Sequence, residues 1–142
     1  MGAIQIVIDT NVIVAALRSK RGASYRLLSL LGDRRFEINV SVPLVLEYEQ
    51  AARGLVRRGG LSTKDIDDIL DYVCAVSHHR NIFYLWRPFL RDPKDDMVLE
   101  LAVVAQCDFI ITYNKRDFRG IQQFGIEPLE PKEFLVKIGE RK

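Results

Sequence analysis

The stretch IQIVIDTNVIVAAL, residues 4–17, decides the fold. Its first five residues are nearly all apolar and rich in branched side chains, which is typical of a strand that is covered on both faces. A helical stretch follows, and between the two lie one carboxylate, one hydroxyl and one amide: Asp9, Thr10 and Asn11. An acid therefore stands where a buried strand runs into a buried helix, and this placement needs an explanation.

The rest of the chain repeats this alternation of short apolar runs and longer helical stretches. We predict strands over residues 3–8, 36–42, 81–85, 108–113 and 126–129. We predict helices over residues 11–18, 23–32, 43–56, 62–77 and 95–106, and from about Pro131 onward. The alternation predicts a single domain, residues 1–142, with a three-layer α/β/α fold around a central parallel sheet of about four to five strands. Ligands of such sheets bind outside the carboxyl ends of the strands, where the strand order reverses.

The composition is that of a globular protein, with 48% hydrophobic residues among 142 and a net charge of +2. This small positive charge permits nucleic-acid binding but does not argue for it. No apolar stretch reaches the roughly 18 residues that cross a bilayer, and no signal segment opens the chain, so we expect a cytoplasmic protein without a membrane partner. The two cysteines, Cys74 and Cys107, lack the spacing of a zinc site and are expected to be core residues.

Acidic residues stand near the predicted ends of several strands. Asp9 follows the first strand, Asp117 lies beyond the strand at 108–113, and two neighbouring acids, Asp95 and Asp96, open a helix. Each has an ordinary explanation when it is taken alone, because Asp is common at helix caps, in first turns and in loops. Within the helix over 43–56, Glu47 and Glu49 lie at opposite edges of the apolar stripe, so periodicity does not choose between them, and either could simply be solvated.

A helical wheel separates the two neighbouring acids of the helix over 95–106. At 100° per residue, Asp95 falls within the apolar sector formed by Val98, Leu99 and Ala102. Asp96 shares the other sector with Glu100. We therefore expect Asp95 to be the acid that points inward, where an ionised carboxylate needs a cation or hydrogen-bond donors.

The topology brings Asp9, Asp95 and Asp117 to one edge of the sheet. Carboxylates within about 4–6 Å of one another repel, and one or more would stay protonated at neutral pH. A hard divalent cation removes this repulsion, and oxygen ligands suit Mg²⁺ or Mn²⁺. The sequence therefore predicts a site for one or two such ions, whereas the lack of well-placed His and Cys disfavours zinc.

Four segments carry a family resemblance: IDTNVIVAAL, VLEYEQ, RDPKDDMVLELA and DFIITYNKRDF. Together they resemble the PIN domain, most closely its bacterial and archaeal toxin branch of the VapC type, and the resemblance covers nearly the whole chain. It implies a Mg²⁺- or Mn²⁺-dependent ribonuclease on a parallel sheet flanked by helices. It also implies a homodimer and a small antitoxin partner whose tail blocks the site.

Carried over residue by residue, the resemblance gives the site four acids: Asp9, Glu47, Asp95 and Asp117. Asp96 doubles the third acid, so that the metal ligand there could be Asp95 or Asp96. Four polar residues are expected to orient the ligands or waters, namely Thr10, Asn11, Thr112 and Asn114. The pair Gln106-Cys107 stands where relatives usually have Gly-Ala, and we expect this departure to affect packing.

Contacts to phosphates are expected to carry most of the affinity for RNA. Six basic residues are candidates, although such charges often serve only solubility: Arg18, Lys20, Arg21, Lys115, Arg116 and Arg119. Phe118 is expected in the core, whereas Tyr113 is left open as a surface for base stacking.

The function expected from the sequence is hydrolysis of RNA phosphodiester bonds by the toxin of a toxin–antitoxin pair. The alternative is a PIN fold without catalysis that binds RNA or protein. A receiver-like signalling domain is disfavoured, because receivers usually have a pair of acids after the first strand and Asp9 stands alone there.

Overall fold

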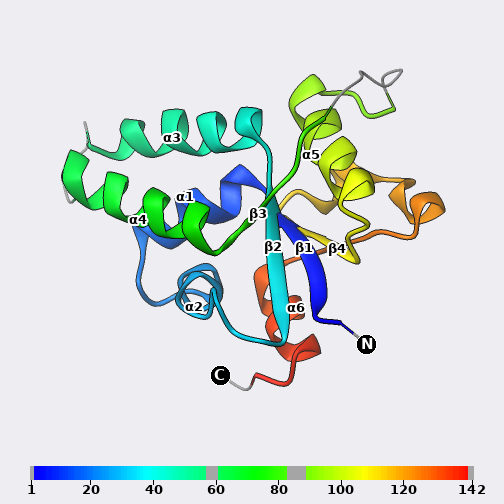
Figure 1. Ribbon diagram of the computed structural model, residues 1–142, viewed down its shortest axis with the longest axis horizontal. Coiled ribbons are helices and arrows are strands. Elements are labelled where there is room, and N and C mark those ends of the chain that lie inside the picture. Colours follow the sequence, from blue (N-terminus) through cyan, green and yellow to red (C-terminus); the bar gives the residue numbers. More distant parts are fainter. Residues whose placement is uncertain (1, 57–60, 83–88, 141–142) are drawn as a thin grey trace.

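The computed structural model describes residues 2–56, 61–82 and 89–140 (Figure 1). Its strands are β1 (Ile4–Ile8), β2 (Phe36–Val40), β3 (His78–His79), β4 (Phe109–Ile111) and β5 (Glu127–Leu129). Its α-helices are α1 (Thr10–Arg18), α2 (Ala23–Ser29), α3 (Val42–Val56), α4 (Thr63–Val76), α5 (Pro93–Val104) and α6 (Pro131–Lys137). Two short 3₁₀ helices, η1 (Lys115–Phe118) and η2 (Ile121–Phe124), lie between β4 and β5.

The five strands form one parallel sheet in the order β3-β2-β1-β4-β5. The chain builds outward from β1 to β3 and then returns to place β4 and β5 on the other side of β1. The strand order therefore reverses between β1 and β4, which is the position where parallel sheets bind their ligands. The parallel sheet of four to five strands predicted from the sequence is confirmed.

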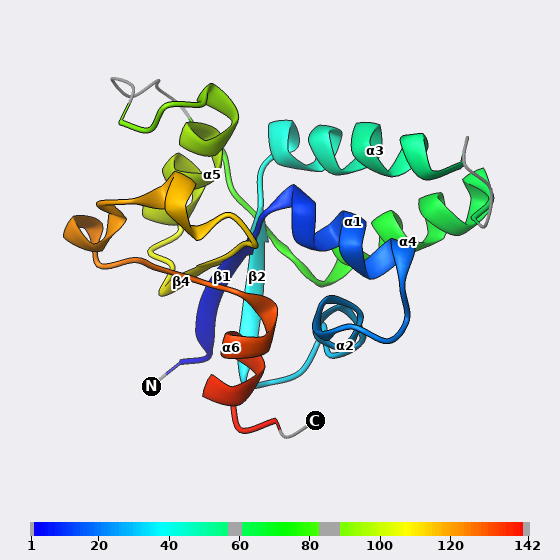
Figure 2. The same cartoon turned by 180° about the vertical axis from the view of Figure 1, so that it is seen from behind.

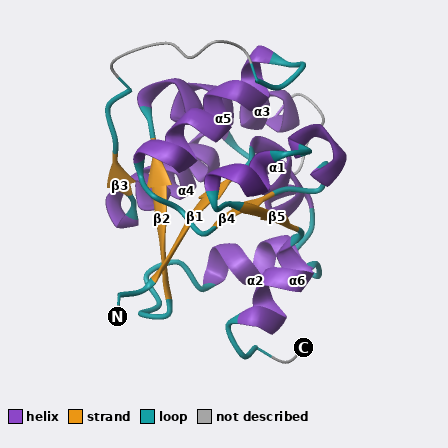
Figure 3. Cartoon of the chain, turned by 90° about the vertical axis from the view of Figure 1, so that its right-hand side faces the viewer, coloured by secondary structure: helices purple, strands orange, loops and turns teal. Residues whose placement is uncertain are grey.

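Helices cover both faces of this sheet (Figure 3). On one face, the ring of Phe134 in α6 packs edge-on against Phe36 of β2 and Phe109 of β4, with centroid distances of 5.2 and 6.0 Å. Figure 2 shows α6 in front of the strands when the molecule is seen from behind. On the other face, α5 contacts β1 and β4, and the amide of Asn39 in β2 lies 3.6 Å from the sulfur of Cys107, just after α5. The layers are helix, sheet and helix, as predicted.

The helix starts follow from local sequence. The Ser62 hydroxyl accepts from the Asp65 N–H and the Asp65 carboxylate accepts from the Ser62 N–H, both at 3.1 Å, which is the capping box that the sequence predicts at the start of α4. The carboxylate of Asp92 caps α5 by accepting from the Lys94 N–H at 2.9 Å, and Pro93 is its first residue. Helix α5 consequently begins two residues before the start that we predicted.

Two other details differ from the prediction. Strand β3 lies at His78–His79, and the strand predicted over 81–85 falls mostly outside the described residues. A two-residue edge strand of exposed polar side chains carries no apolar alternation that could reveal it. Of the two cysteines expected in the core, Cys107 is buried but Cys74 is only partly so. Among the described residues, no helix is long and apolar enough to cross a membrane.

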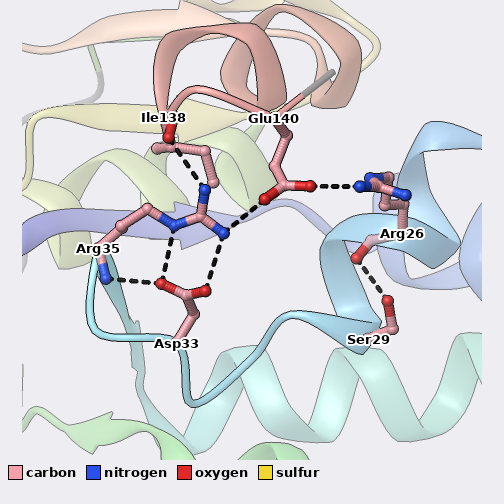
Figure 4. Close-up of polar contacts among 6 residues, drawn as sticks. All are labelled: Arg26, Ser29, Asp33, Arg35, Ile138 and Glu140. Atoms are coloured by element: carbon pink, nitrogen blue, oxygen red, sulfur yellow. Dashed lines mark hydrogen bonds and ion pairs between the residues drawn. The ribbon is translucent and has the colours of Figure 1, made fainter. Parts of the chain in front are cut away.

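A cluster of charges ties the end of α6 to the segment between α2 and β2 (Figure 4). The Arg35 guanidinium donates to Asp33 at 2.8 and 2.9 Å, to the Ile138 carbonyl at 3.1 Å and to Glu140 at 2.7 Å. Arg26 of α2 pairs with the same Glu140. The hydrogen bonds from Arg35 lower the pKa of Asp33 to about 2. This cluster lies at the amino ends of the strands, away from the edge where ligands are expected.

Candidate metal centre

The carboxyl ends of β1 and β4 lie side by side, and Asp9 and Thr112 follow them. The Asp9 N–H donates to the Ile111 carbonyl at 2.9 Å, and the Thr112 hydroxyl donates to Oδ2 of Asp9 at 2.8 Å. Asp9 and the polar residues at the start of α1 thus stand at the position where the strand order reverses.

Asp9 caps α1 and is also part of an acidic cluster. Its Oδ1 accepts from the Thr10 N–H at 2.9 Å. Burial raises the pKa of Asp9, its hydrogen bonds from Thr112 and Thr10 lower it, and the nearby carboxylates of Glu47 and Asp117 raise it further, so that the net direction is upward. In the described part of the chain, no basic side chain forms an ion pair with Asp9.

A small polar frame fixes this carboxylate relative to β4. The Asn11 amide approaches both Asp9 and the Thr112 hydroxyl at 3.4 Å, and its Oδ1 accepts from the Tyr113 N–H at 3.2 Å. The Thr112 hydroxyl in turn accepts from the Asn114 N–H at 3.0 Å. Thr10 behaves differently, because its buried hydroxyl has no hydrogen-bond partner among the described residues. A buried hydroxyl of this kind is usually satisfied by water or a ligand.

Asp95 approaches the cluster from the first turn of α5. It is partly buried and lines a cavity together with Asp117. Burial is the largest cause that raises its pKa, and the charges of Asp9, Asp92, Asp117 and Glu47 add to it, so that the pKa reaches about 7. The electrostatic coupling places the four predicted acids in one neighbourhood.

Asp96 is the more buried of the two neighbouring acids, so the prediction from the helical wheel is wrong. Only 9% of it is exposed, and its Oδ1 accepts from the N–H groups of Phe89 at 3.1 Å and Leu90 at 2.8 Å. Glu100, which we expected beside it in the outer sector, is also buried. The wheel fails because α5 is covered on nearly all sides and therefore has no single apolar face. Asp96 secures the preceding loop, whereas Asp95 lines the cavity.

Glu47 and Glu49, which periodicity could not separate, have different surroundings. The hydroxyl of the fully buried Tyr48 donates to the Ile8 carbonyl, which holds α3 against the end of β1. Glu47 is partly buried, and its charge raises the pKa of Asp9, Asp95 and Tyr48. Glu49 instead pairs with Arg53 at 3.0 Å. The position of Glu47 therefore matches that of a member of the acidic cluster.

Asp117 lies in η1 and is exposed to the cavity. The neighbouring Phe118 is fully buried, as expected, and anchors this turn in the core. Tyr113 is half exposed, and its hydroxyl shares a hydrogen bond with Ser24 of α2.

The six basic residues predicted to bind RNA do not gather at one place. Arg116 and Arg119 line the cavity of Asp95 and Asp117. Lys115 pairs with Glu133 at 2.9 Å, and Lys20 lines a separate cavity between α1, α2 and α4. Arg18 and Arg21 are exposed near the end of α1 and line neither cavity. Sequence reasoning missed Phe89 and Arg91, which also line the acidic cavity.

The donor set suits a hard divalent cation by its chemistry, because it offers carboxylate oxygens from four segments of the chain and no ion-paired basic partner among the described residues. Thr10, the residue after Asp9, has a buried hydroxyl that no described residue satisfies. In residues 2–56, 61–82 and 89–140, however, no three His, Cys, Asp or Glu side chains are already arranged to hold an ion. Binding of an ion between these acids would therefore require their carboxylates to rotate toward one another.

Comparison with known families adds an independent finding. The PIN domain model matches residues 5–116, a span from β1 into η1 that includes Asp9, Glu47 and Asp95 and ends one residue before Asp117. The chain belongs to the PIN domain family. Among solved structures, this PIN domain is similar to a chain of VapBC2 from Rickettsia felis, crystallised with a DNA fragment from its promoter. The TM-score is 0.61 at 15% identity, over 89% of this chain and 100% of the other, so that the likeness is one of fold. No curated protein matches the sequence significantly.

Proposed function

We propose that this PIN domain is a metal-dependent ribonuclease that hydrolyses RNA phosphodiester bonds. The observation that carries the proposal is the gathering of Asp9, Glu47, Asp95 and Asp117 without a basic partner among the described residues. Burial and the charges of neighbouring acids raise the pKa of Asp9 and Asp95, and a carboxyl group with a raised pKa opposes folding at neutral pH. Such an arrangement is expected where a cation binds between the acids.

Each part of the site has a role in this proposal. Asp9 and Asp95 would hold Mg²⁺ or Mn²⁺, and Glu47 and Asp117 would complete the set or bind a second ion. When bound, the ion lowers the pKa of a water molecule and neutralises charge on the phosphoryl oxygens. Asn11 and Thr112 keep the Asp9 carboxylate in position through the hydrogen bonds described above. Thr10 and Asn114 stand beside them and would bind waters around the ion.

Cleavage of a single-stranded RNA oligonucleotide, with Mg²⁺, with Mn²⁺ and with EDTA, tests the proposal. Asp9→Asn should abolish cleavage and leave the metal-free fold intact or more stable, because it removes a buried carboxylate whose pKa is raised. Glu49→Gln is the matched control, because this acid of α3 is already paired with Arg53, and it should cut at the parental rate. Parental activity in Asp9→Asn would refute the assignment. Metal-independent binding without any cleavage would instead support the catalytically silent alternative.

We further propose that the nuclease acts in the cytoplasm as the toxin of a toxin–antitoxin pair. The similarity in fold to a chain of VapBC2 supports this proposed role. A cavity of about 660 Å³ between α1, α2 and α4 also supports it, because Leu17, Leu28 and Ile69 give it apolar walls that an amphipathic partner segment could cover. A small protein encoded beside this chain that co-purifies with it and blocks its cleavage of RNA would be the expected partner.

A homodimer is part of the same proposal. Val42 and Leu46 expose large apolar side chains one turn apart on α3, and exposed apolar groups of this kind often mark a protein interface. Size-exclusion chromatography with light scattering would give twice the chain mass, and Leu46→Lys should shift it toward the monomer.

A further inference from the structure

The cavity beside the acidic cluster has an aromatic and basic part that the proposed metal chemistry does not use. Its volume is about 590 Å³, within the range of roughly 300–1,000 Å³ that is usual for small-ligand sites. Three acids line one part of it: Asp92, Asp95 and Asp117. Phe89, Leu90 and three arginines line the rest: Arg91, Arg116 and Arg119. A cavity that joins acids, an aromatic ring and guanidinium groups can hold a ligand with a flat apolar part and negative charges.

Phe89 is held in place although 39% of it is exposed. Its ring makes an edge-to-face contact with Phe124, with centroids 5.2 Å apart. The ring also lies close to the backbone at Gly120, where a Cβ would stand only 3.3 Å from it. The φ of Gly120 is +88°, which also favours glycine there. The carboxylate of Asp96 holds the Phe89 backbone from the other direction. An exposed ring that is fixed by its neighbours is suited to stacking on a flat partner at little cost in conformational entropy.

The three arginines of the cavity are available for phosphates. All three are exposed, and none forms an ion pair with a described acid, although Asp95 and Asp117 line the same cavity. Guanidinium groups bind phosphate oxygens in a bidentate manner and also stack on bases. Lys115 contrasts with them, because Glu133 already neutralises it.

We propose that this cavity receives one unpaired nucleobase of the RNA, stacked on Phe89, while the arginines bind the flanking phosphates. A phosphodiester next to that base then lies at Asp95 and Asp117. The inference rests on the proposed nuclease function, because that function explains why a phosphodiester should lie beside Asp95 and Asp117. Binding of the base itself does not require cleavage. A duplex keeps its bases stacked and paired, so the site selects single-stranded RNA.

Binding of a single-stranded RNA decamer that carries one 2-aminopurine tests the inference, because stacking quenches the fluorescence of this base. The protein carries Asp9→Asn so that the RNA stays intact. Phe89→Leu, which keeps an apolar side chain but removes the ring, should weaken binding about 5- to 150-fold and abolish the quenching. Phe89→Tyr should bind within about twofold of the parent. Tyr25→Leu is the matched control, because Tyr25 is 37% exposed but lines the separate cavity between α1, α2 and α4, and it should change nothing.

The salt dependence separates stacking from charge. Arg119→Gln should reduce the slope of log K against log salt by about 0.7, the value for one phosphate contact on a single strand. Phe89→Leu should lower the affinity without changing that slope. A blunt RNA duplex of the same sequence should bind more weakly than the single strand and should not respond to Phe89→Leu.

The outcomes distinguish this inference from the nuclease proposal. Unquenched fluorescence, or equal binding by Phe89→Leu and its parent, would overturn the base site even if the wild-type protein cuts RNA. Equal losses by Phe89→Leu on single strands and duplexes would overturn it as well. Quenching that depends on Phe89 in a protein that never cuts RNA would support the base site and refute only the nuclease. A single-stranded DNA decamer that binds equally well would widen the substrate class to both nucleic acids and leave the base site in place.

Discussion

Replacing Asp95 by Asn is expected to stabilise the metal-free protein. Burial and four neighbouring acids raise the pKa of Asp95 to about 7 in the folded chain, from about 3.8 in the unfolded chain. A carboxyl group whose pKa is higher in the folded state destabilises that state progressively as the pH rises from about 4 to about 7, and fully above pH 7. The folded protein with EDTA should therefore be more stable at pH 5.5 than at pH 8. Asn carries no charge and removes most of this dependence, while Asp9, whose pKa is also raised, retains part of it.

The magnitude follows from the two pKa values. Their difference corresponds to about 4 kcal/mol between the protonation states. Asp95 is only partly buried, so solvent screening reduces the expected gain at pH 8 to about 1–2 kcal/mol. For a chain of this size, that gain should raise the melting temperature by about 3–8 °C. Differential scanning calorimetry with EDTA at pH 5.5 and pH 8 measures it directly.

Adding metal should make the parent more stable than Asp95→Asn. Mn²⁺ at 100 times its dissociation constant stabilises the parent by about 2.7 kcal/mol, whereas Asp95→Asn should lose most of this gain. Asp96→Asn is the matched control. Its Oδ1 can still accept from Phe89 and Leu90, so it should be slightly less stable than the parent and should keep the Mn²⁺ response. The reasoning would be refuted if Asp95→Asn melted at or below the parent with EDTA at pH 8, or if Asp96→Asn were the variant that lost the response to Mn²⁺.

Two further predictions concern the frame around the site. Gln106 lies two residues after the end of α5 and has a φ of +54°, a conformation that suits glycine. Gln106→Gly should therefore raise the free energy of unfolding by about 0.5–1 kcal/mol in urea titrations, and a lower midpoint would mean that packing of the Gln106 side chain outweighs the strain. Hydrogen bonds from Arg26 and Arg35 lower the pKa of Glu140 in the folded chain. The ionised Glu140 therefore stabilises the folded state at neutral pH, and this stabilisation is lost as the carboxyl group is protonated in acid. Glu140→Gln should accordingly reduce the urea midpoint at pH 7, and the difference from the parent should shrink at pH 3. A difference that does not change with pH would show that the charge of Glu140 is not what stabilises the fold.

The sequence predicts the architecture well because the features that determine it are local. The run IQIVI forms a strand that is covered on both faces, and the polar triplet that begins at Asp9 stands at the strand end, as the order of elements implies. The capping box at Ser62 and the proline at the start of α6 set helix starts through neighbours in the chain. The reversal of strand order at β1 then brings Asp9 and Thr112 together without any further information.

The details that sequence could not predict depend on distant parts of the chain. The prediction that Asp95 rather than Asp96 points inward fails because residues 89–90 fold back over Asp96. A helical wheel contains no information on a loop that covers the helix. Phe89 and Arg91 lie in an irregular segment without periodicity, so only the folded structure reveals that they line the acidic cavity. The short edge strand at His78–His79 exists because β2 offers it a partner, and its own composition does not favour a strand.

The cluster around Arg35 has a practical consequence. It secures the final helix at the pole where the strands begin, and the described chain starts just before β1 and ends at Glu140, within the cluster. A tether fused to either end would consequently leave the carboxylate rim facing the bulk solution. Immobilised on a sensor chip in that orientation, the protein would present its acidic cluster to flowing oligonucleotides.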